Sequence, residues 1–311
     1  MNSLKKYGLN YLKGMAMGAA DIVPGVSGGS IALIAGIYQQ LLDSINSFNM
    51  ENLLLLKAFR IKEFYARVQG NFLLSLLLGI LTSIFALSRV ITLLMEEYPI
   101  PLWSFFCGLI LVSAFLILKN IKRWTGGVVL ALVSGTVFAW LVTNLPPMNT
   151  TDAQWFTFVA GAIAICAMIL PGISGSFILL ILGKYETILM AVSQKDIFTL
   201  GLFAAGCLVG LLSFSRVVAF LLRRFYGSTI GVLSGFMLGS INKLWPWKLV
   251  TAWRMSSKGH QTPFLTENIL PGAYLDKVGQ QPQIVWAIGA FLLGIGIVLF
   301  IEWLANKLQV A

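Results

Sequence analysis

The stretch that decides the fold is Ile22-Val23-Pro24-Gly25-Val26-Ser27-Gly28-Gly29-Ser30, which recurs as Ile169-Leu170-Pro171-Gly172-Ile173-Ser174-Gly175-Ser176. In both copies an apolar run is interrupted by Pro-Gly and resumes after a serine and a glycine. Proline removes a backbone donor and clashes with the preceding helical turn, and glycine lets the chain leave helical geometry. Each copy therefore predicts a helix that breaks inside an apolar segment.

The similarity between the two halves extends well beyond the motif. At one offset Gly36 aligns with Gly183, and at a second offset Ser88-Arg89-Val90 aligns with Ser215-Arg216-Val217. An ordered series of such matches indicates two copies of one unit. We predict a single membrane domain made of two repeats. The first repeat is 1–150, with a re-entrant hairpin at 9–43 and spans within 71–145; the second is 151–311, with a hairpin at 153–192 and spans within 198–304.

The composition places the chain in lipid. Of its 311 residues 58% are hydrophobic and only 11% are charged, with a mean hydropathy of +0.84, which is far more apolar than a soluble domain. A helix needs about 20 apolar residues to cross a bilayer. Runs that approach this length predict an all-α integral membrane protein: 72–94, 102–118, 126–145, 200–222 and 284–304, with a shorter, glycine-rich run at 229–241.

The charged and metal-binding residue types exclude several functions. The net charge of +10 comes from short basic patches beside apolar runs, a pattern typical of cytoplasmic loops near anionic lipid rather than of nucleic-acid binding. The three cysteines lie inside apolar runs, where they act as small hydrophobic residues. The sequence has one histidine and no zinc cluster, dinucleotide fingerprint or P-loop. We therefore expect no metal and no cofactor.

The number of spans between the two motifs sets the orientation of the repeats. If both broken segments are re-entrant, three spans separate them, so the second unit enters from the opposite side and the repeats are inverted. The basic residues of 57–67, 119–123 and 223–224 then lie inside. The loop 242–282 lies outside, although it carries Lys243, Lys248 and three further basic residues. If each broken segment crossed fully instead, the repeats would be parallel.

The resumed helices after the two breaks are candidate anion sites. A helix N-terminus carries about half a positive charge, so two such tips near the membrane midplane would attract an anion. The alternative is that the glycines only allow close helix packing, but the repetition of the motif favours a function. The hydroxyls and glycines of the two tips are Ser27, Gly28, Gly29, Ser30, Ser174, Gly175 and Ser176.

Two arginines form a second repeated feature. Arg89 and Arg216 each lie inside an apolar run, where a charge costs about 2.5 to 3.5 kcal/mol at the centre of a span. Guanidinium groups suit bidentate binding of phosphate. The alternative is that both side chains reach to the nearest interface, but their repeat symmetry favours substrate binding.

A single acidic residue precedes the first motif. Asp21 lies three residues before Pro24, and its repeat equivalent is Met168. It can carry a proton, pair with an arginine, bind a cation or cap the local turn, and the sequence does not separate these roles. The glycine-rich run with Gly231 and Gly235 likewise fits packing within the protomer or between protomers of a homo-oligomer.

The stretch 18–30, with its second copy at 170–176, resembles the PopT family of bacterial and archaeal polyprenyl-phosphate transporters, and the resemblance covers nearly the whole chain. It implies a transporter that returns undecaprenyl phosphate, the lipid carrier of cell-wall assembly, across the cytoplasmic membrane. Ser30 departs from the threonine expected at its position. The resemblance places these motif residues at the substrate site: Asp21, Pro24, Gly25, Ser27, Gly28, Pro171, Gly172, Ser174 and Gly175.

This resemblance fits the residues. A phosphate head needs cationic and N–H partners to cross hydrocarbon, whereas an isoprenoid tail can stay among membrane lipids. We expect alternating access, with the phosphate held at the two tips and by Arg89 or Arg216, and with protonation of Asp21 as a means of coupling to a proton gradient.

Two other functions remain as alternatives. Membrane undecaprenyl pyrophosphate phosphatases also have inverted repeats and a Pro-Gly-x-Ser motif, but there Arg-Ser follows the serine. Here Gly28-Gly29 and Gly175-Ser176 follow, and no nearby histidine or carboxylate pair activates the serine. We therefore predict that the protein is not an enzyme. A channel or exchanger for a small anion would use the same tips without a lipid.

Overall fold

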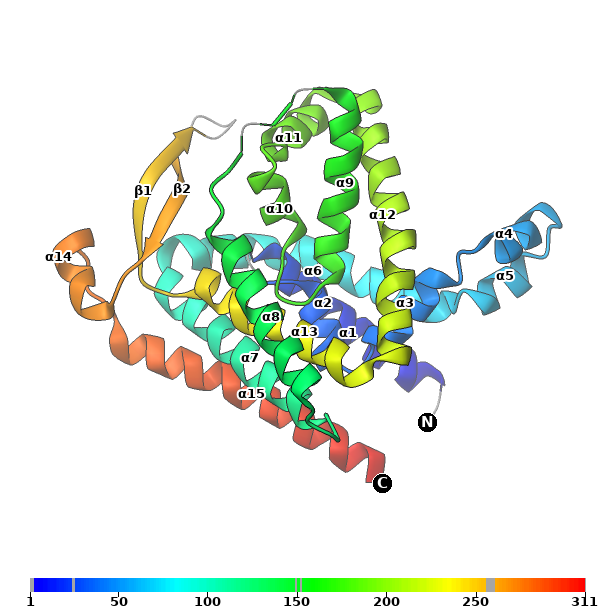
Figure 1. Ribbon diagram of the computed structural model, residues 1–311, viewed down its shortest axis with the longest axis horizontal. Coiled ribbons are helices and arrows are strands. Elements are labelled where there is room, and N and C mark those ends of the chain that lie inside the picture. The colour runs from blue at the N-terminus through cyan, green and yellow to red at the C-terminus, as the bar shows by residue number, and fades with distance from the viewer. Residues whose placement is uncertain (1–2, 24–25, 149, 152, 256–260, 311) are drawn as a thin grey trace.

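The computed structural model describes residues 3–23, 26–148, 150–151, 153–255 and 261–310, and most of them are helical (Figure 1). Within these residues, five helices are long and apolar enough to cross a bilayer. The prediction of a multi-pass helical membrane protein is thereby confirmed. Each helix coincides with an apolar run of the sequence: α6 (Gly70–Glu97), α7 (Pro99–Lys119), α8 (Gly126–Asn144), α12 (Ile197–Arg224) and α15 (Ile284–Val310).

Each motif lies between two helices of a broken segment. The first segment has α1 (Ser3–Ile22), α2 (Gly28–Ile34) and α3 (Tyr38–Asn46). The second has α9 (Gln154–Ile169), α10 (Gly175–Ile181) and α11 (Tyr185–Gln194). Both short helices end before a glycine with positive φ, Gly36 at +68° and Gly183 at +63°, a conformation that favours glycine. After Gly183 the chain bends sharply, with 107° between α10 and α11.

The packing of the helices repeats in the two halves of the chain. Helix α1 lies along α6, and the equivalent α9 lies along α12. The close approach uses equivalent glycines, because a Cβ on Gly79 would meet the carbonyl of Tyr11 and one on Gly206 would meet that of Phe158. The remaining spans exchange partners between the halves: α7 packs on α15, and α8 packs on α13 (Tyr226–Leu244). The two halves therefore interlock.

Helix α13 contains the glycine-rich run of the sequence. A Cβ on Gly235 or Gly239 would meet a carbonyl oxygen of α8, which belongs to the same chain. Of the two packings left open by the sequence, the structure shows the one within the protomer. The side of α13 near Phe236 and Met237 faces the second break, where Met237 has no exposed surface.

A helical pair between α3 and α6 has no counterpart in the second half. Helices α4 (Met50–Lys57) and α5 (Ile61–Arg67) extend away from the other helices in Figure 1. They account for the change in offset between repeat equivalents, from 147 residues (Gly14 and Gly161) to 127 (Gly79 and Gly206).

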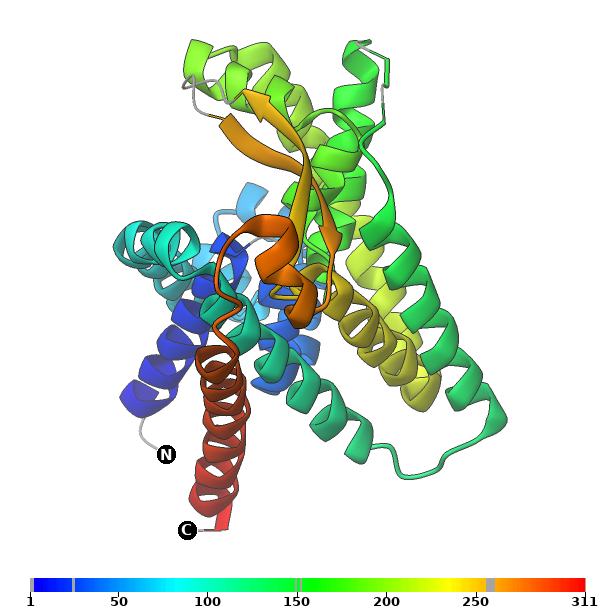
Figure 2. The same cartoon turned by 90° about the vertical axis from the view of Figure 1, so that its left-hand side faces the viewer.

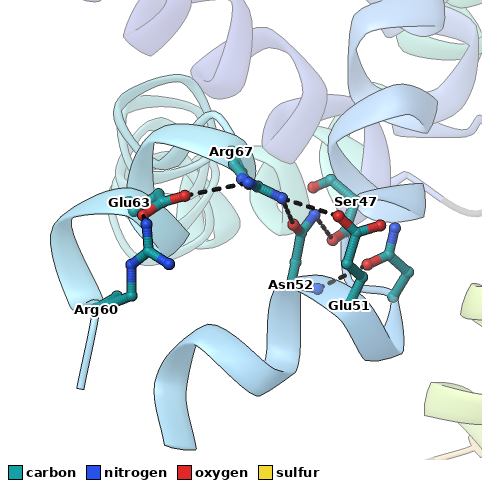
Figure 3. Close-up of polar contacts among 7 residues, drawn as sticks. Ser47, Glu51, Asn52, Arg60, Glu63 and Arg67 are labelled. Atoms are coloured by element: carbon teal, nitrogen blue, oxygen red, sulfur yellow. Dashed lines mark hydrogen bonds and ion pairs between the residues drawn. The ribbon is translucent and has the colours of Figure 1, made fainter. Parts of the chain in front are cut away.

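A single guanidinium joins this helical pair. Figure 3 shows Arg67 between α4 and α5, with donor distances of 3.2 Å to Glu51, 3.1 Å to Asn52 and 3.1 Å to Glu63. Asn52 in turn donates to the carbonyl of Ser47 at 2.8 Å. The two short helices are therefore fixed to one another by polar contacts on one side.

The loop 242–282 is folded, which the all-α prediction did not anticipate. It contains an antiparallel pair of strands, β1 (Lys248–Met255) and β2 (Gln261–Asn268), followed by a 3-10 turn η1 (Pro271–Ala273) and α14 (Tyr274–Val278). The strands are rich in β-branched and aromatic residues, which favour extended structure. Two indoles hold the base of this pair of strands in place, since Trp245 donates to the carbonyl of Ile269 and Trp247 donates to the carbonyl of Pro282. Figure 2 shows this hairpin and α14 beyond the start of α15.

Candidate functional site

The two sequence motifs meet at the centre of the molecule. The hydroxyl of Ser27 donates to the carbonyl of Met168 at 3.0 Å, and the backbone N–H of Gly172 donates to the hydroxyl of Ser30 at 2.8 Å. The phenol of Tyr38 donates to the carbonyl of Ile169 at 3.1 Å. The first repeat therefore supplies side-chain partners for the backbone groups that the second break leaves unpaired. Pro24 and Gly25 lie outside the described residues.

Burial makes these contacts necessary. Val23, Val26, Ser27 and Ser30 are at most 1% exposed, and the main apolar core surrounds them. A buried backbone group without a partner costs about 1 to 3 kcal/mol, and lipid offers no substitute partner. The hydroxyls of the first motif thus stabilise the end of α9, where the second helix breaks.

The second break is also enclosed by its neighbours. Pro171, Gly172, Ile173 and Gly175 are buried. Gly172 has φ +88°, and a Cβ there would lie 2.7 Å from the carbonyl oxygen of Phe236 on α13. Only glycine fits this position without strain.

The serines of the second motif differ from those of the first. The hydroxyls of Ser174 and Ser176 bond each other at 2.8 Å, and Ser176 is exposed. Ser27, in contrast, accepts from the backbone N–H of Gly29 at 3.1 Å and so caps α2. The two tips are therefore not equivalent.

The first tip already holds a carboxylate. Asp21 is partly buried, and its Oδ1 accepts from the backbone N–H of Gly28 at 2.7 Å. A Cβ on Gly28 would collide with this carboxyl group, so the glycine permits the approach. Of the roles that the sequence left open for Asp21, the structure shows the capping contact. The second tip has Met168 in the equivalent place, and so it lacks this negative charge.

The two arginines are not enclosed by the protein, which differs from the expectation of buried side chains. Arg89 on α6 and Arg216 on α12 are both exposed, and neither forms a hydrogen bond or an ion pair with another described residue. The neighbour Ser215 is instead buried and bonded to Asn46. The sequence could not predict that these arginines are exposed, because a lipid-facing and a core-facing position of a spanning helix can have the same sequence neighbours.

Two lysines that the sequence marks only as loop charges lie at and just beyond the end of α13. Lys243 and Lys248 are partly buried and rest against the aromatic rings of Phe177 and Trp103. The available signal in the sequence was their place in a loop that the predicted inverted topology puts outside, where positive charge is disfavoured.

Comparison with known proteins identifies relatives along most of the chain. A profile of the VCA0040-like family, described as undecaprenyl phosphate translocase-like, matches residues 17–262. A protein of Vibrio cholerae serotype O1 named polyprenyl-phosphate transporter is 45% identical over 297 residues, which cover 96% of both chains. A protein of Staphylococcus aureus (strain NCTC 8325 / PS 47) with the same name is 32% identical over 76% of this chain and 86% of its own. No solved structure matches significantly.

These relatives agree with the resemblance drawn from the repeated motif and with the expectation that the protein is not an enzyme. The matched region contains both breaks and every helix from α2 to α13. The chain belongs to the VCA0040-like family of undecaprenyl phosphate translocase-like proteins.

Proposed function

We propose that this protein carries polyprenyl phosphate, with undecaprenyl phosphate as the first candidate, between the leaflets of the cytoplasmic membrane. The observation that carries the proposal is the 45% identity over 96% of both chains with a polyprenyl-phosphate transporter. The fold suits this task, because two helix breaks packed together at the centre of a helical membrane protein are how many secondary transporters build a substrate site.

We further propose that the two repeats are inverted. Helices α6, α7 and α8 separate the two broken segments, and an odd number of spans reverses the second unit. The bend of 107° between α10 and α11 supports a chain that turns back within the membrane rather than crossing it. The exchange of partners, with α7 on α15 and α8 on α13, is the pattern expected for two units related by a two-fold axis in the membrane plane.

Alternating access is the mechanism that we propose for these repeats, and an asymmetry between them supports it. Helix α3 packs against α12 of the other half, so that Leu42 is only 1% exposed. Its equivalent α11 packs on α10 and α12, without a comparable packing on α6, and Leu189 is 43% exposed. Because the halves have the same design, a second state with α11 against α6 and α3 released is expected.

The proposed substrate region contains the tips of both breaks. Arg89 and Arg216 lie on the lipid-facing surfaces of α6 and α12, where the phosphate would pass on its way to the tips. At the first tip Asp21 already neutralises the helix N-terminus, so the phosphate is expected at the second. Protonation of Asp21 would remove its negative charge, weaken its bond to the backbone N–H of Gly28 and so loosen the first break, and this is our proposed route for coupling to protons.

The test is lipid translocation by the purified protein in vesicles. Undecaprenyl phosphate is placed in both leaflets, and a membrane-impermeant phosphatase is added outside. With the protein present the inner pool should be consumed as well, whereas vesicles without protein should stop near half. The Arg89→Ala/Arg216→Ala double variant should be slower. Release of trapped inorganic phosphate without any lipid movement would instead favour a small-anion channel.

A further inference from the structure

Two lysines lie together where α13 ends and the β-hairpin begins. The Nζ atom of Lys243 is 4.7 Å from the centre of the Phe177 ring, and the Nζ atom of Lys248 is 4.6 Å from the centre of the Trp103 ring. The ammonium group of Lys248 also donates to the backbone carbonyl of Lys243. Among the described residues, no carboxylate pairs with either lysine.

The electrostatics of this pair favour an anion. Burial, together with the positive charge of Lys243, lowers the pKa of Lys248 to about 7. Aromatic faces offset only part of the cost of desolvating an ammonium group. An anion placed between the two ammonium groups would remove their repulsion and hold both protonated.

The neighbours of the lysines suit an anion that is attached to an apolar chain. Phe177 directly follows Ser176 of the second motif, so Lys243 lies beside the second tip. Asn242 precedes Lys243 and lines a groove of about 290 Å³ between α8 and α13. The rest of the groove lining is predominantly apolar: Thr136, Val137, Trp140, Leu238, Gly239 and Ile241.

We propose that Lys243 and Lys248 bind the phosphate head of polyprenyl phosphate, and that the groove between α8 and α13 receives the isoprene units next to it. This inference rests on the proposed function and names the residues that hold the head. In such a lipid the phosphate is joined directly to the isoprenoid chain, so apolar contacts begin beside the charge. Aromatic rings in contact with both ammonium groups match this chemistry better than they match a fully hydrated small anion.

The site also accounts for two of the positive charges of the loop that begins at residue 242. The inverted topology places this loop outside, where basic residues are disfavoured. Lys243 and Lys248 fold inward onto α7 and α10 instead of facing solvent. On this topology the site faces the outer leaflet.

Binding to the full-length protein in detergent tests the proposal. Native mass spectrometry compares undecaprenyl phosphate with undecaprenol and with inorganic phosphate as competitors. The wild type should prefer the phosphate lipid, and Lys243→Gln and Lys248→Gln should each bind it at least tenfold more weakly. Lys277→Gln, a control at an exposed lysine of α14, should bind as the wild type does.

A second measurement uses only the wild-type protein, so it does not depend on the folding of a variant. Acylation of Lys243 and Lys248 by an amine-reactive reagent at pH 8 is quantified by peptide mass spectrometry. Undecaprenyl phosphate should protect both lysines, and undecaprenol should not.

The outcomes separate this site from the proposed function. A wild type without preference for the phosphate lipid would overturn both. Normal lipid binding by both glutamine variants, with no protection of the lysines, would overturn the site and leave the function in place. Equal protection by inorganic phosphate would show that the lysines bind a small anion rather than the lipid.

Discussion

At the scale of single residues, the two breaks depend on hydroxyl groups. Ser30 has no exposed surface, and its hydroxyl accepts the backbone N–H of Gly172. Ser30→Ala would leave this N–H unpaired and should destabilise the protein by about 1 to 3 kcal/mol. Ser30→Thr retains the hydroxyl and should lose less. Thermal unfolding in detergent measures both variants, and equal stability of Ser30→Ala and wild type would show that the bond contributes nothing.

The pKa of Lys248, about 7, gives a second prediction at this scale. Lys243 from α13, the Trp103 ring from α7 and the cross-strand Asn268 face it, while Asp276 and Lys277 of the neighbouring α14 are exposed. Above pH 7 the free protein loses the proton that the bound phosphate requires, so affinity for undecaprenyl phosphate should fall by up to about tenfold per pH unit.

The measurement belongs between pH 7.5 and 9, because the second ionisation of a phosphate monoester, near pH 6, is then complete. Lys248→Arg keeps its charge throughout this range, and its binding should change little with pH. A wild-type profile as flat as that of the variant would contradict the assignment of the titration to Lys248.

At the scale of elements, the breaks need glycine where the chain turns against a neighbour. Gly172 has φ +88°, and a Cβ added there would lie 2.7 Å from the carbonyl oxygen of Phe236, whereas Gly36 has φ +68° and open space around it. Gly36→Ala should cost about 1 to 2 kcal/mol from conformation alone. Gly172→Ala should cost more, because the tip must also move away from α13. Unfolding measurements that rank the two variants in the opposite order would show that α13 moves away from position 172 at little cost in free energy.

The polar contacts that join α4 and α5 can be tested separately from the breaks. Arg67 bonds Glu51, Asn52 and Glu63, whereas the side chain of Arg60, the residue before α5, forms among the described residues only its ion pair with Glu63 of α5. Arg67→Met should increase amide hydrogen exchange across residues 50–67, because the contacts that join the two helices are lost. Exposed ion pairs contribute about 0.2 to 1 kcal/mol each, so Arg60→Met should have almost no effect.

At the scale of the whole molecule, the different packing of the equivalent helices α3 and α11 predicts a second state. Asn46 and Ser215 bond each other at 2.8 Å, and their repeat equivalents are Ser193 and Ser88. In a protein without its native cysteines, Asn46→Cys/Ser215→Cys should form a disulfide that stops translocation until it is reduced. Ser193→Cys/Ser88→Cys should form one as well, in the opposite state, and should also stop transport. Absence of the second disulfide during active transport would argue against a symmetric exchange of states.

The elements that the sequence could predict are those with a strong local signal. Pro-Gly in an apolar run locates each break, and run length locates α6, α7, α8, α12 and α15. Contacts between distant residues carry no such signal. The bonds from Ser27 and Ser30 to the other repeat depend on how the halves are placed, as do the exposure of Arg89 and the inward fold of Lys248.

The hydrogen bonds between the two breaks also affect how the protein is synthesised and inserted. Ser27 and its acceptor Met168 are separated by 141 residues, so the first broken segment emerges from the ribosome long before its partner exists. Until then the hydroxyls of Ser27 and Ser30 lack their final partners in the membrane, and contacts of this sequence separation form late. Nascent chains that end before residue 168 should therefore be protease-sensitive around Ser27 and Ser30, and this sensitivity should disappear once the second motif has been inserted.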